Sequence, residues 1–500
     1  MYIISYDLGT GGVKAALYTE TLTTVCKCFI EYPMFFPKPG YHEQRPDTWW
    51  NAIIQSTRLL LSKTNVSPSK VKALSISGQS LTGIPIDKDG NSLLDQVPIW
   101  SDQRATEEVS FFFNSIDEKQ WYLTTGNGFP APCYTIFKLM WLKKHFPDIF
   151  SKIAYILGSK DYINYKMTGN IVTDHSYASG TGGYNLHKHN YEKKFWDVAE
   201  IPLELLPPIQ NSESIVGSLL PSVAQELGLS SKTLVIAGGV DNSCMALGCT
   251  GIRDGASYIS LGSSSWVPVT SSKPVLDYLT KPYVFAHIEP NMYTSAYSIF
   301  SGGSSLRWVR DTLFSDITDN PYQTIDQYAK TSPVGANGVF FNPTLAGGTS
   351  QDKSTHIQGG FVGLSLSTTR SDLARSVLEG ITMNLKQSMD FLSKQVALDD
   401  TILICGGGSK SPFWLQLFSD ILNRNVVKTN IDQDTASLGA AAIAAKALGF
   451  IDSYDIIPSL HKIESSYTPQ QSNVLLYEKL CLRFNQLSDM LSDFGDTLFQ

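Results

Sequence analysis

The sequence predicts an α/β fold made of two similar halves, each built around a mixed sheet. The chain has 500 residues, more than the roughly 250–300 that one hydrophobic core supports. Segments with strand-like and helix-like spacing alternate along it, which is typical of α/β proteins. Leu8-Gly9-Thr10 aligns with Leu261-Gly262-Ser263 at an offset of 253 residues. Together these observations favour a duplicated domain whose halves face each other.

Composition and charge exclude some classes of partner. Apolar residues make up 42% of the chain and charged residues 17%, a balance typical of folded proteins. The formal charge of −7 argues against a nucleic-acid partner bound through a broad basic face. It leaves room for a small anion held by backbone amides.

No segment predicts export or membrane insertion. Residues 1–7 lack the basic start of a signal peptide. The most apolar long segment, 436–450, is interrupted by Lys446 and falls short of a span of ~18 apolar residues, so it predicts a packed internal helix. The seven cysteines show no CxxC spacing, and we expect reduced thiols in a cytoplasmic protein without a membrane partner.

The first half opens with two predicted strands, 2–6 and 13–18, joined by a tight turn. A helix is expected to start at the N-cap candidate Asp47. A strand at 73–79 runs into glycine, and an amphipathic helix covers 137–146. Residues rich in Gly, His, Asn and Tyr predict an ordered loop or short hairpin at 172–194.

The second half opens with a similar strand, turn and strand at 257–269. We place the boundary near residues 248–256, which predicts domains over 1–248 and 249–500. A long helix from residue 370 is expected to be capped by Ser371. A strand at 402–408 then runs into glycine, as its counterpart does in the first half.

The turn at 7–12 has chemistry that suits a phosphate group. Its glycines let successive N–H groups face an anion, and Thr10 adds a hydroxyl donor. Asp7 at the strand end can hold a hydrated Mg²⁺, and Lys14 can reach back as a point charge. The turn at 262–265 offers a matching cradle. A plain tight turn is the alternative, and neither turn has the P-loop or dinucleotide spacing.

Two further segments place polar or small residues at strand ends. Asp241 follows the buried-strand pattern 234–240, where ligands bind in open α/β sheets. Its carboxylate could take a proton from a substrate hydroxyl, or it could cap a helix over 243–248. Residues 406–414 join a strand to a helix, and their small side chains could let a purine lie against the backbone. A plain loop is the alternative there.

In this order the motifs resemble those of the FGGY family of carbohydrate kinases, from residue 3 to about 449. The resemblance implies two actin-like ATPase (ribonuclease H-like) domains in tandem, with a catalytic cleft between them. It also implies ATP and Mg²⁺ as cofactors. The motifs that carry it are 7–14, 43–50, 77–79, 100–104, 138–142, 160–163, 167–169, 173–174, 238–242, 363–379, 405–420 and 437–441.

The resemblance also implies a role for individual residues. Asp241 matches the catalytic base. The nucleotide would contact four segments. The first phosphate motif corresponds to Asp7, Gly9, Thr10, Gly11 and Lys14, and the second to Gly262, Ser263 and Ser264. A following segment contributes Gly303 and Arg307, and the adenosine motif contributes Gly407 and Ser411. The polyol would contact Gln79, Ser80, Leu81, Trp100, Asp241 and Asn242.

The implied substrate is a small sugar or polyol, with a ketopentose such as D-xylulose favoured because the pattern is most similar to xylulose kinases. Those usually carry Gln-Met-His-Gly where this chain has Gln79-Ser-Leu-Thr. The Arg-Glu pair of glycerol kinases is also missing. Many relatives carry Gly-Glu-Arg-Thr-Pro in the loop that here contains Gly348 and Thr349, which puts the contacts of that loop in question.

Other functions stay open at this point. Another FGGY substrate, such as ribulose, another ketose, a sugar acid, a tetritol or glycerol, is one alternative. An actin-like ATPase without a sugar acceptor is a second, because one fold hosts both functions. A relative with lost or altered activity is a third. The sequence leaves the oligomeric state, including a homodimer, undecided.

Overall fold

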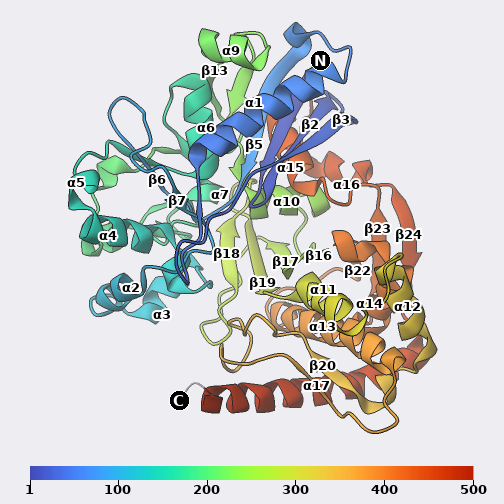
Figure 1. The fold of residues 1–500 in the computed structure, drawn as a ribbon. Coiled ribbons are helices and arrows are strands. Elements are labelled where there is room, and N and C mark those ends of the chain that lie inside the picture. Colours follow the sequence, from blue (N-terminus) through green and yellow to red (C-terminus); the bar gives the residue numbers. More distant parts are fainter. Residues whose placement is uncertain (499–500) are drawn as a thin grey trace.

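The computed structural model describes residues 1–498 and has one seven-stranded mixed sheet in each half of the chain (Figure 1). The first sheet has the order β13-β14-β5-β1-β2-β3, with β15 paired to β5, and the second has the order β18-β19-β17-β16-β22-β23-β24. The strands of the first are β1 (Tyr2–Leu8), β2 (Gly12–Thr19), β3 (Thr24–Glu31), β5 (Val71–Gly78), β13 (Ile215–Ser218), β14 (Leu234–Ile236) and β15 (Gly239–Val240). Those of the second are β16 (Tyr258–Leu261), β17 (Ser265–Ser271), β18 (Tyr283–Ala286), β19 (Tyr293–Ile299), β22 (Thr401–Cys405), β23 (Asn425–Thr429) and β24 (Ile463–Tyr467).

Both halves build their glycine turn in the same way, which confirms the predicted hairpins. β1 and β2 are antiparallel, with Asp7 opposite Lys14, and β1 is parallel to β5. In the second half β16 and β17 are antiparallel and β16 is parallel to β22. Each turn therefore follows a strand that also pairs in parallel with a strand from later in its own half. This arrangement confirms the predicted repeat.

The N-terminal caps of two long helices differ from those that the sequence predicts. Helix α1 (Pro46–Ser62) starts at a proline, whose fixed φ suits the first helical position. Asp47 therefore lies in the first turn rather than at the N-cap. Helix α13 (Arg370–Ser393) is capped by Thr369 in a capping box with Asp372. The prediction of Ser371 as the cap is wrong, because the reciprocal hydrogen bonds of the capping box join Thr369 and Asp372.

Helix α15 (Thr435–Ala447) belongs to the second half but packs against the first sheet. Ile3 of β1 and Ala73 of β5 share its apolar cluster, which confirms a packed internal helix at this place. It crosses α10 (Asp241–Thr250) at two glycines. A Cβ on Gly248 would lie 1.8 Å from the Thr435 carbonyl oxygen, and one on Gly439 would lie 1.9 Å from that of Cys244. Only glycine allows the helices to approach so closely.

The remaining elements form the outer layers. Among the described residues, no helix is both long and apolar enough to cross a membrane. The segment 172–194 contains the short hairpin β10–β11 that the sequence predicts, and also a short helix, α7, that it does not. The helices are α2 (Thr106–Phe113), α3 (Glu118–Thr125), α4 (Thr135–His145), α5 (Pro147–Phe150), α6 (Ser159–Thr168), α7 (His175–Ala178), α8 (Lys193–Val198), α9 (Pro221–Leu227), α11 (Gly302–Leu313), α12 (Pro321–Thr331), α14 (Pro412–Leu422), α16 (Ile457–Leu460) and α17 (Gln471–Leu498). The short strands are β4 (Glu43–Gln44), β6 (Ile84–Ile86), β7 (Val97–Pro98), β8 (Tyr155–Leu157), β9 (Thr173–Asp174), β10 (Tyr184–Asn185), β11 (Asn190–Tyr191), β12 (Ile209–Gln210), β20 (Phe340–Asn342) and β21 (Gly360–Val362).

Candidate active site

The first glycine turn holds a carboxylate beside an ammonium group. Asp7 ends β1, and its Oδ2 lies 3.8 Å from Nζ of Lys14 on β2. The Ser77 hydroxyl of β5 donates to Oδ1 of Asp7 at 3.4 Å. Burial raises the pKa of Asp7, and Lys14 and Ser77 offset part of that effect. Gly9 and Gly11 lie in the same turn, and a Cβ on Gly11 would meet no protein atom within 4 Å.

Asp241 is the first residue of α10 and follows β15, which pairs with the end of β5. Its Oδ1 accepts a hydrogen bond of 2.9 Å from the backbone N–H of Asn242. Burial raises its pKa to about 7, and the negative charge of Asp7 adds to the shift. A carboxylate with a pKa in this range is matched to proton transfer near neutral pH. The N-cap itself is Val240, so Asp241 does not cap the helix.

Gln79 and Trp100 are brought to the same turn through shared hydrogen bonds. Gln79 donates its backbone N–H to the carbonyl of Leu8 at 2.9 Å, and its Nε2 to Oε1 of Gln44 at 2.8 Å. Gln44 in turn donates to the Thr10 carbonyl at 2.6 Å, and Trp100 donates its Nε1 to Oγ1 of Thr10 at 2.9 Å. Within residues 1–498, Oε1 of Gln79 has no partner. Gln44 lies in a motif noted in the sequence, although no role was predicted for it.

Leu81 lies differently from the other predicted polyol contacts. Its side chain is 1% exposed and belongs to an aromatic core cluster that includes Phe137. Its backbone has a φ of 59°, and its carbonyl accepts a hydrogen bond of 3.2 Å from the buried Lys138 ammonium group. Lys138 also donates to the Ile99 carbonyl, next to Trp100, and burial lowers its pKa to about 8. Lys138 therefore holds the backbone at Leu81 and at Ile99 through hydrogen bonds. Ser80, which precedes Leu81, is also buried.

Aromatic rings from both halves meet near Asp241. Trp100 lies 6.5 Å from Phe129, and Phe129 stacks on Tyr283 of β18 at 4.2 Å between ring centroids. Trp266, which follows the second glycine turn, lies parallel to Tyr283 at 6.3 Å. Burial and, to a lesser extent, the Asp241 carboxylate raise the pKa of Tyr283. The sequence analysis missed this group of rings, because no local motif links residues so far apart in the chain.

The second glycine turn lines a cavity of about 640 Å³. Gly303 of α11 donates its N–H to the Gly262 carbonyl at 2.9 Å, and Arg307 donates to Oγ of Ser263 at 3.4 Å. Ser264 is exposed and does not line the cavity. The cavity joins six of the residues predicted to contact nucleotide, namely Gly262, Ser263, Gly303, Arg307, Gly407 and Ser411.

Helix α12 supplies the wall of this cavity that the sequence analysis missed. Tyr322 and Asp326 line it together with Trp414 of α14. Burial raises the pKa of Asp326, and a hydrogen bond with Ser411 offsets part of the shift. No glycine turn or strand end marks α12, so nothing in the sequence pattern pointed to it.

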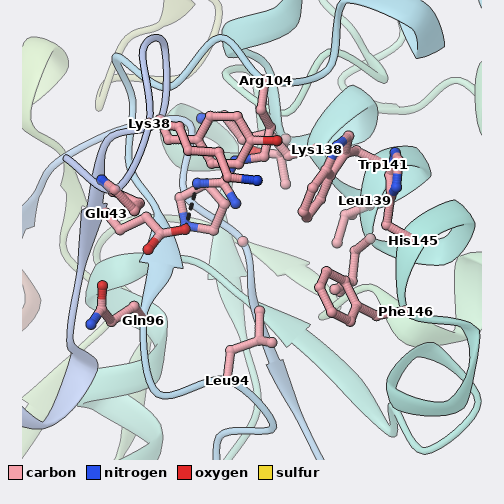
Figure 2. Close-up of a pocket in the computed structure, with 16 residues that line it drawn as sticks. Lys38, Glu43, Leu94, Gln96, Arg104, Lys138, Leu139, Trp141, His145 and Phe146 are labelled. Carbon is pink, nitrogen blue, oxygen red and sulfur yellow. Dashed lines mark hydrogen bonds and ion pairs between the residues drawn. The ribbon is translucent and has the colours of Figure 1, made fainter. Parts of the chain in front are cut away.

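A separate cavity of about 550 Å³ lies against α4 and contains none of the predicted site residues (Figure 2). Arg104 crosses it, donating to Glu43 at 2.6 Å, with its guanidinium 4.0 Å from the ring of Tyr41 and 4.8 Å from that of Trp141. Figure 2 also shows Lys138 at its wall. The motif residues Glu43 and Arg104 thus hold this part of the first half together.

The loop that contains Gly348 and Thr349, whose sequence differs from that of many FGGY kinases, still contacts the rest of the protein. The Thr349 N–H donates to Asp352 at 2.8 Å, and Ser350 donates to the carbonyl of Lys281 at 3.1 Å. Lys281 in turn forms an ion pair with Glu118 of α3. This loop is therefore connected to α3 through Lys281, although it lacks the Glu-Arg pair.

Behind the Gln79 segment lies a buried triad of charges. Lys160 of α6 pairs with Asp161 and, at 2.9 Å, with Asp174, and all three side chains are at most 1% exposed. Burial lowers the pKa of Lys160, but the two carboxylates outweigh it and raise that pKa overall. Ser159, which precedes the triad, donates to the Gln79 carbonyl at 2.7 Å. The motifs at 160–163 and 173–174 are thus structural supports.

The carboxylates of the site fit a weakly coordinated metal ion. Over residues 1–498 no group of three or more His, Cys, Asp or Glu side chains is placed to hold a metal. Mg²⁺ needs no such cage, because it keeps several waters and takes one or two carboxylates together with substrate phosphates. Asp7, beside the first glycine turn and close enough to Asp241 to shift its pKa, fits that requirement.

Comparison with known proteins agrees with this arrangement. Models of the N-terminal and C-terminal domains of the FGGY family of carbohydrate kinases match residues 2–248 and 257–448. A xylulose kinase of Staphylococcus epidermidis is 31% identical over 95% of this chain and 94% of its own. Solved structures of a xylulose kinase and a gluconate kinase, both from Lactobacillus acidophilus, each have a TM-score of 0.93 and 28% identity over 99% of both chains.

The fold and the matching family models together define a phosphotransferase with two actin-like domains. The chain belongs to the FGGY family of carbohydrate kinases. It is therefore a sugar kinase, which takes its phosphate from ATP and passes it to a small-molecule sugar.

Proposed function

We propose that this sugar kinase phosphorylates a neutral ketopentose, with D-xylulose as the first candidate. The observation that carries the proposal is a group of polar side chains. Gln79 and Asn242 follow the paired strands β5 and β15 beside Asp241, and Trp100 bonds to Thr10 of the first glycine turn. Among the described residues, no Lys or Arg side chain has a hydrogen bond or ion pair to these groups. A neutral polyol suits such a lining, because its hydroxyl groups both donate and accept. The similarity to xylulose kinases supports the same substrate class.

In the proposed reaction Asp241 accepts the proton of a sugar hydroxyl as its oxygen attacks the γ-phosphorus of ATP. The P–O bond to the β-phosphate breaks, and ADP leaves. The 640 Å³ cavity would hold the adenosine, and the two glycine turns would direct N–H groups at the phosphates. Bound Mg²⁺, held through Asp7, would neutralise phosphate charge. Gln79 and Trp100 would orient the sugar, and closure of the two halves would exclude water.

A panel of sugars tests the substrate. ADP release would be measured with D-xylulose, D-ribulose, D-gluconate, glycerol and erythritol at equal concentrations. We expect the highest kcat/KM for D-xylulose, with charged or shorter acceptors lower by on the order of 10- to 100-fold. Equal ATP hydrolysis with and without any sugar would contradict the proposal and favour an ATPase.

D-gluconate is the second candidate, because one of the two structures with a TM-score of 0.93 is a gluconate kinase. The carboxylate of D-gluconate would need a cation beside it. Among residues 1–498, the cation bonded to the segment 79–81 is Lys138, but its ammonium group already donates to the carbonyls of Leu81 and Ile99. A kcat/KM for D-gluconate above that for D-xylulose would decide in favour of this acceptor.

Substituting Gly11 tests the phosphate turn separately from the sugar site. Because a Cβ on Gly11 meets no protein atom within 4 Å, Gly11→Ala should fold with an unchanged melting temperature. A phosphate lying against the turn would meet the new methyl group, so we expect kcat/KM for ATP to fall on the order of 10- to 100-fold.

The matched control is Gly360→Ala in β21, where a Cβ is equally free of neighbours. It should leave both the melting temperature and the kinetics unchanged. Unaltered ATP kinetics in Gly11→Ala would show that phosphate does not approach this turn.

A further inference from the structure

The cavity of about 550 Å³ against α4 is large enough for a second small molecule (Figure 2). Ligand sites in proteins enclose about 300–1,000 Å³. The walls of this cavity come mainly from residues 37–43 and 94–98 and from α4, all in the first half of the chain. None of the residues that we assign to nucleotide or sugar lines it. The proposed reaction therefore leaves this cavity without a role.

Two buried cations line this cavity with N–H groups that no described residue accepts. The Arg104 side chain is 4% exposed and Lys138 is 5% exposed. Of the five N–H groups of Arg104, two donate to Asp102 and one to Glu43, which leaves both groups of Nη1 without a partner within residues 1–498. The Lys138 ammonium group has three N–H groups and donates two of them, to backbone carbonyls. A buried donor without an acceptor is unfavourable, so these groups favour a ligand that accepts hydrogen bonds.

The charge of the lining also favours an anion. Lys38 is a third cation, which is exposed and has no ion pair within residues 1–498. Glu43 is the one carboxylate among the described residues of the lining, and Asp102 lies behind Arg104 with its side chain fully buried. With His145 neutral, the three cations exceed the two carboxylates by one charge. A singly charged anion therefore balances the site, whereas a phosphate group, which carries about 1.5 to 2 negative charges, exceeds it.

Apolar and aromatic side chains form the other part of the lining, and those that Figure 2 labels are Leu94, Leu139, Trp141 and Phe146. In that view Lys38, Arg104 and Lys138 lie along the upper side of the cavity, and Leu94 and Phe146 lie below them. The polar and the apolar groups are thus on different sides of one space. A ligand that fits both sides carries its charge at one end and a flat apolar body at the other.

We propose that this cavity binds a small aromatic carboxylate, at a site separate from the nucleotide and the sugar. The carboxylate accepts the unused N–H groups of Arg104 and Lys138, and the ring packs against Leu94 and Phe146. Burial and, less strongly, the charge of Arg104 lower the pKa of Lys138 to about 8. A carboxylate beside both cations reduces their repulsion. Lys38 at the rim adds a long-range attraction for the same charge.

Calorimetry of the full chain with 3-phenylpropanoate, and with its neutral amide, tests the chemistry of the ligand. We expect a Kd on the order of 1 mM or below for the acid and a Kd at least about tenfold higher for the amide, which lacks the charge. A saturating nonhydrolysable ATP analogue should leave the Kd unchanged, because the two cavities share no lining residue. No measurable binding, equal binding of acid and amide, or loss of binding in the presence of the analogue would each overturn the proposal.

Two tryptophans report on the place of binding, because Trp141 lines this cavity and Trp414 lines the nucleotide cavity. In a chain labelled with fluorotryptophan, 3-phenylpropanoate should shift the fluorine resonance of Trp141, assigned with Trp141→Phe, and leave that of Trp414 in place. A Trp141 resonance that does not move at saturation would overturn the proposal. No sugar is present, so the result is independent of the proposed substrate.

A change of charge at the rim tests the recognition of the anion without disturbing the core. Lys38→Glu should raise the Kd for 3-phenylpropanoate by at least about fivefold, with unchanged kcat and melting temperature, because Lys38 is exposed. Lys232→Glu makes the same change of charge at an exposed residue outside the cavity, and it should bind the probe as the wild type does. A Lys38→Glu variant with the wild-type Kd would contradict the proposed site.

Discussion

Asp241→Asn is expected to lower kcat for sugar phosphorylation by about 10²- to 10⁴-fold, the range that a positioned general base contributes. The amide keeps the shape of the carboxylate but cannot accept the hydroxyl proton. The KM for ATP should change little, because the nucleotide cavity lies in the second half and does not include Asp241. Steady-state kinetics with both substrates varied would measure the effect. A variant that retains wild-type turnover would remove Asp241 as the base.

The pH dependence gives an independent readout of the same group. Because the pKa of Asp241 is about 7, kcat/KM for sugar should fall tenfold per pH unit below that value as the base becomes protonated. The folded state also holds this proton more tightly than the unfolded state, whose Asp pKa is about 3.9. Its contribution to stability is therefore complete below pH ~4 and is lost as the pH rises to about 7. Asp241→Asn should remove that part of the pH dependence.

Lys160→Met is expected to lower the free energy of unfolding by about 3–5 kcal/mol at pH 7, the effect of removing one partner from a buried ion pair. Two carboxylates, Asp161 and Asp174, would be left buried without their cation. Urea unfolding followed by tryptophan fluorescence would measure the loss. Because burial raises the pKa of Asp161 even with Lys160 present, protonation should reduce the loss as the pH falls from 7 to 5.

Lys166→Met on the same helix is the matched control. Lys166 is partly exposed and lies 5.8 Å from the ring of Trp50, so we expect a change within about 1 kcal/mol. If both variants lost equal stability, the helix rather than the ion triad would be responsible. Gel filtration of Lys160→Met at pH 5 and pH 7 would show whether the chain stays folded for the kinetic measurement.

Local patterns predicted the parts of the fold whose cause is local. Asp7 to Gly12 and the turn after Leu261 have glycine between β-branched or aromatic runs, and both are tight turns between paired strands. Helix starts were less accurate. Thr369 rather than Ser371 caps α13, because the Asp372 side chain accepts a hydrogen bond from the Thr369 N–H. The preference of single residue types for the N-cap position does not include that bond.

The site was predictable to the extent that each residue belongs to a turn or a strand end. Asp241, Gly262 and Gly407 lie at such places, and the structure brings Gly262 and Gly407 into one cavity. Tyr322 lies in the first turn and Asp326 in the middle of the amphipathic helix α12, where the pattern indicates only which face is buried. Leu81 differs in the opposite way. Its neighbours in the sequence are polar, which favours an exposed position, but its side chain is buried and its carbonyl accepts a hydrogen bond from Lys138. Tertiary contacts decide such positions.

The glycine crossing of α10 and α15 limits how far the two halves can shear past each other. Gly248 lies seven residues after Asp241 in one rigid helix, a lever arm of only about 10 Å. A rotation of about 20° about this pivot would carry the Asp241 carboxylate by only about 3–4 Å. The far ends of the molecule would sweep through several times that distance. Such a rotation would combine a large movement at the far ends of the molecule with only a small adjustment of the Asp241 carboxylate.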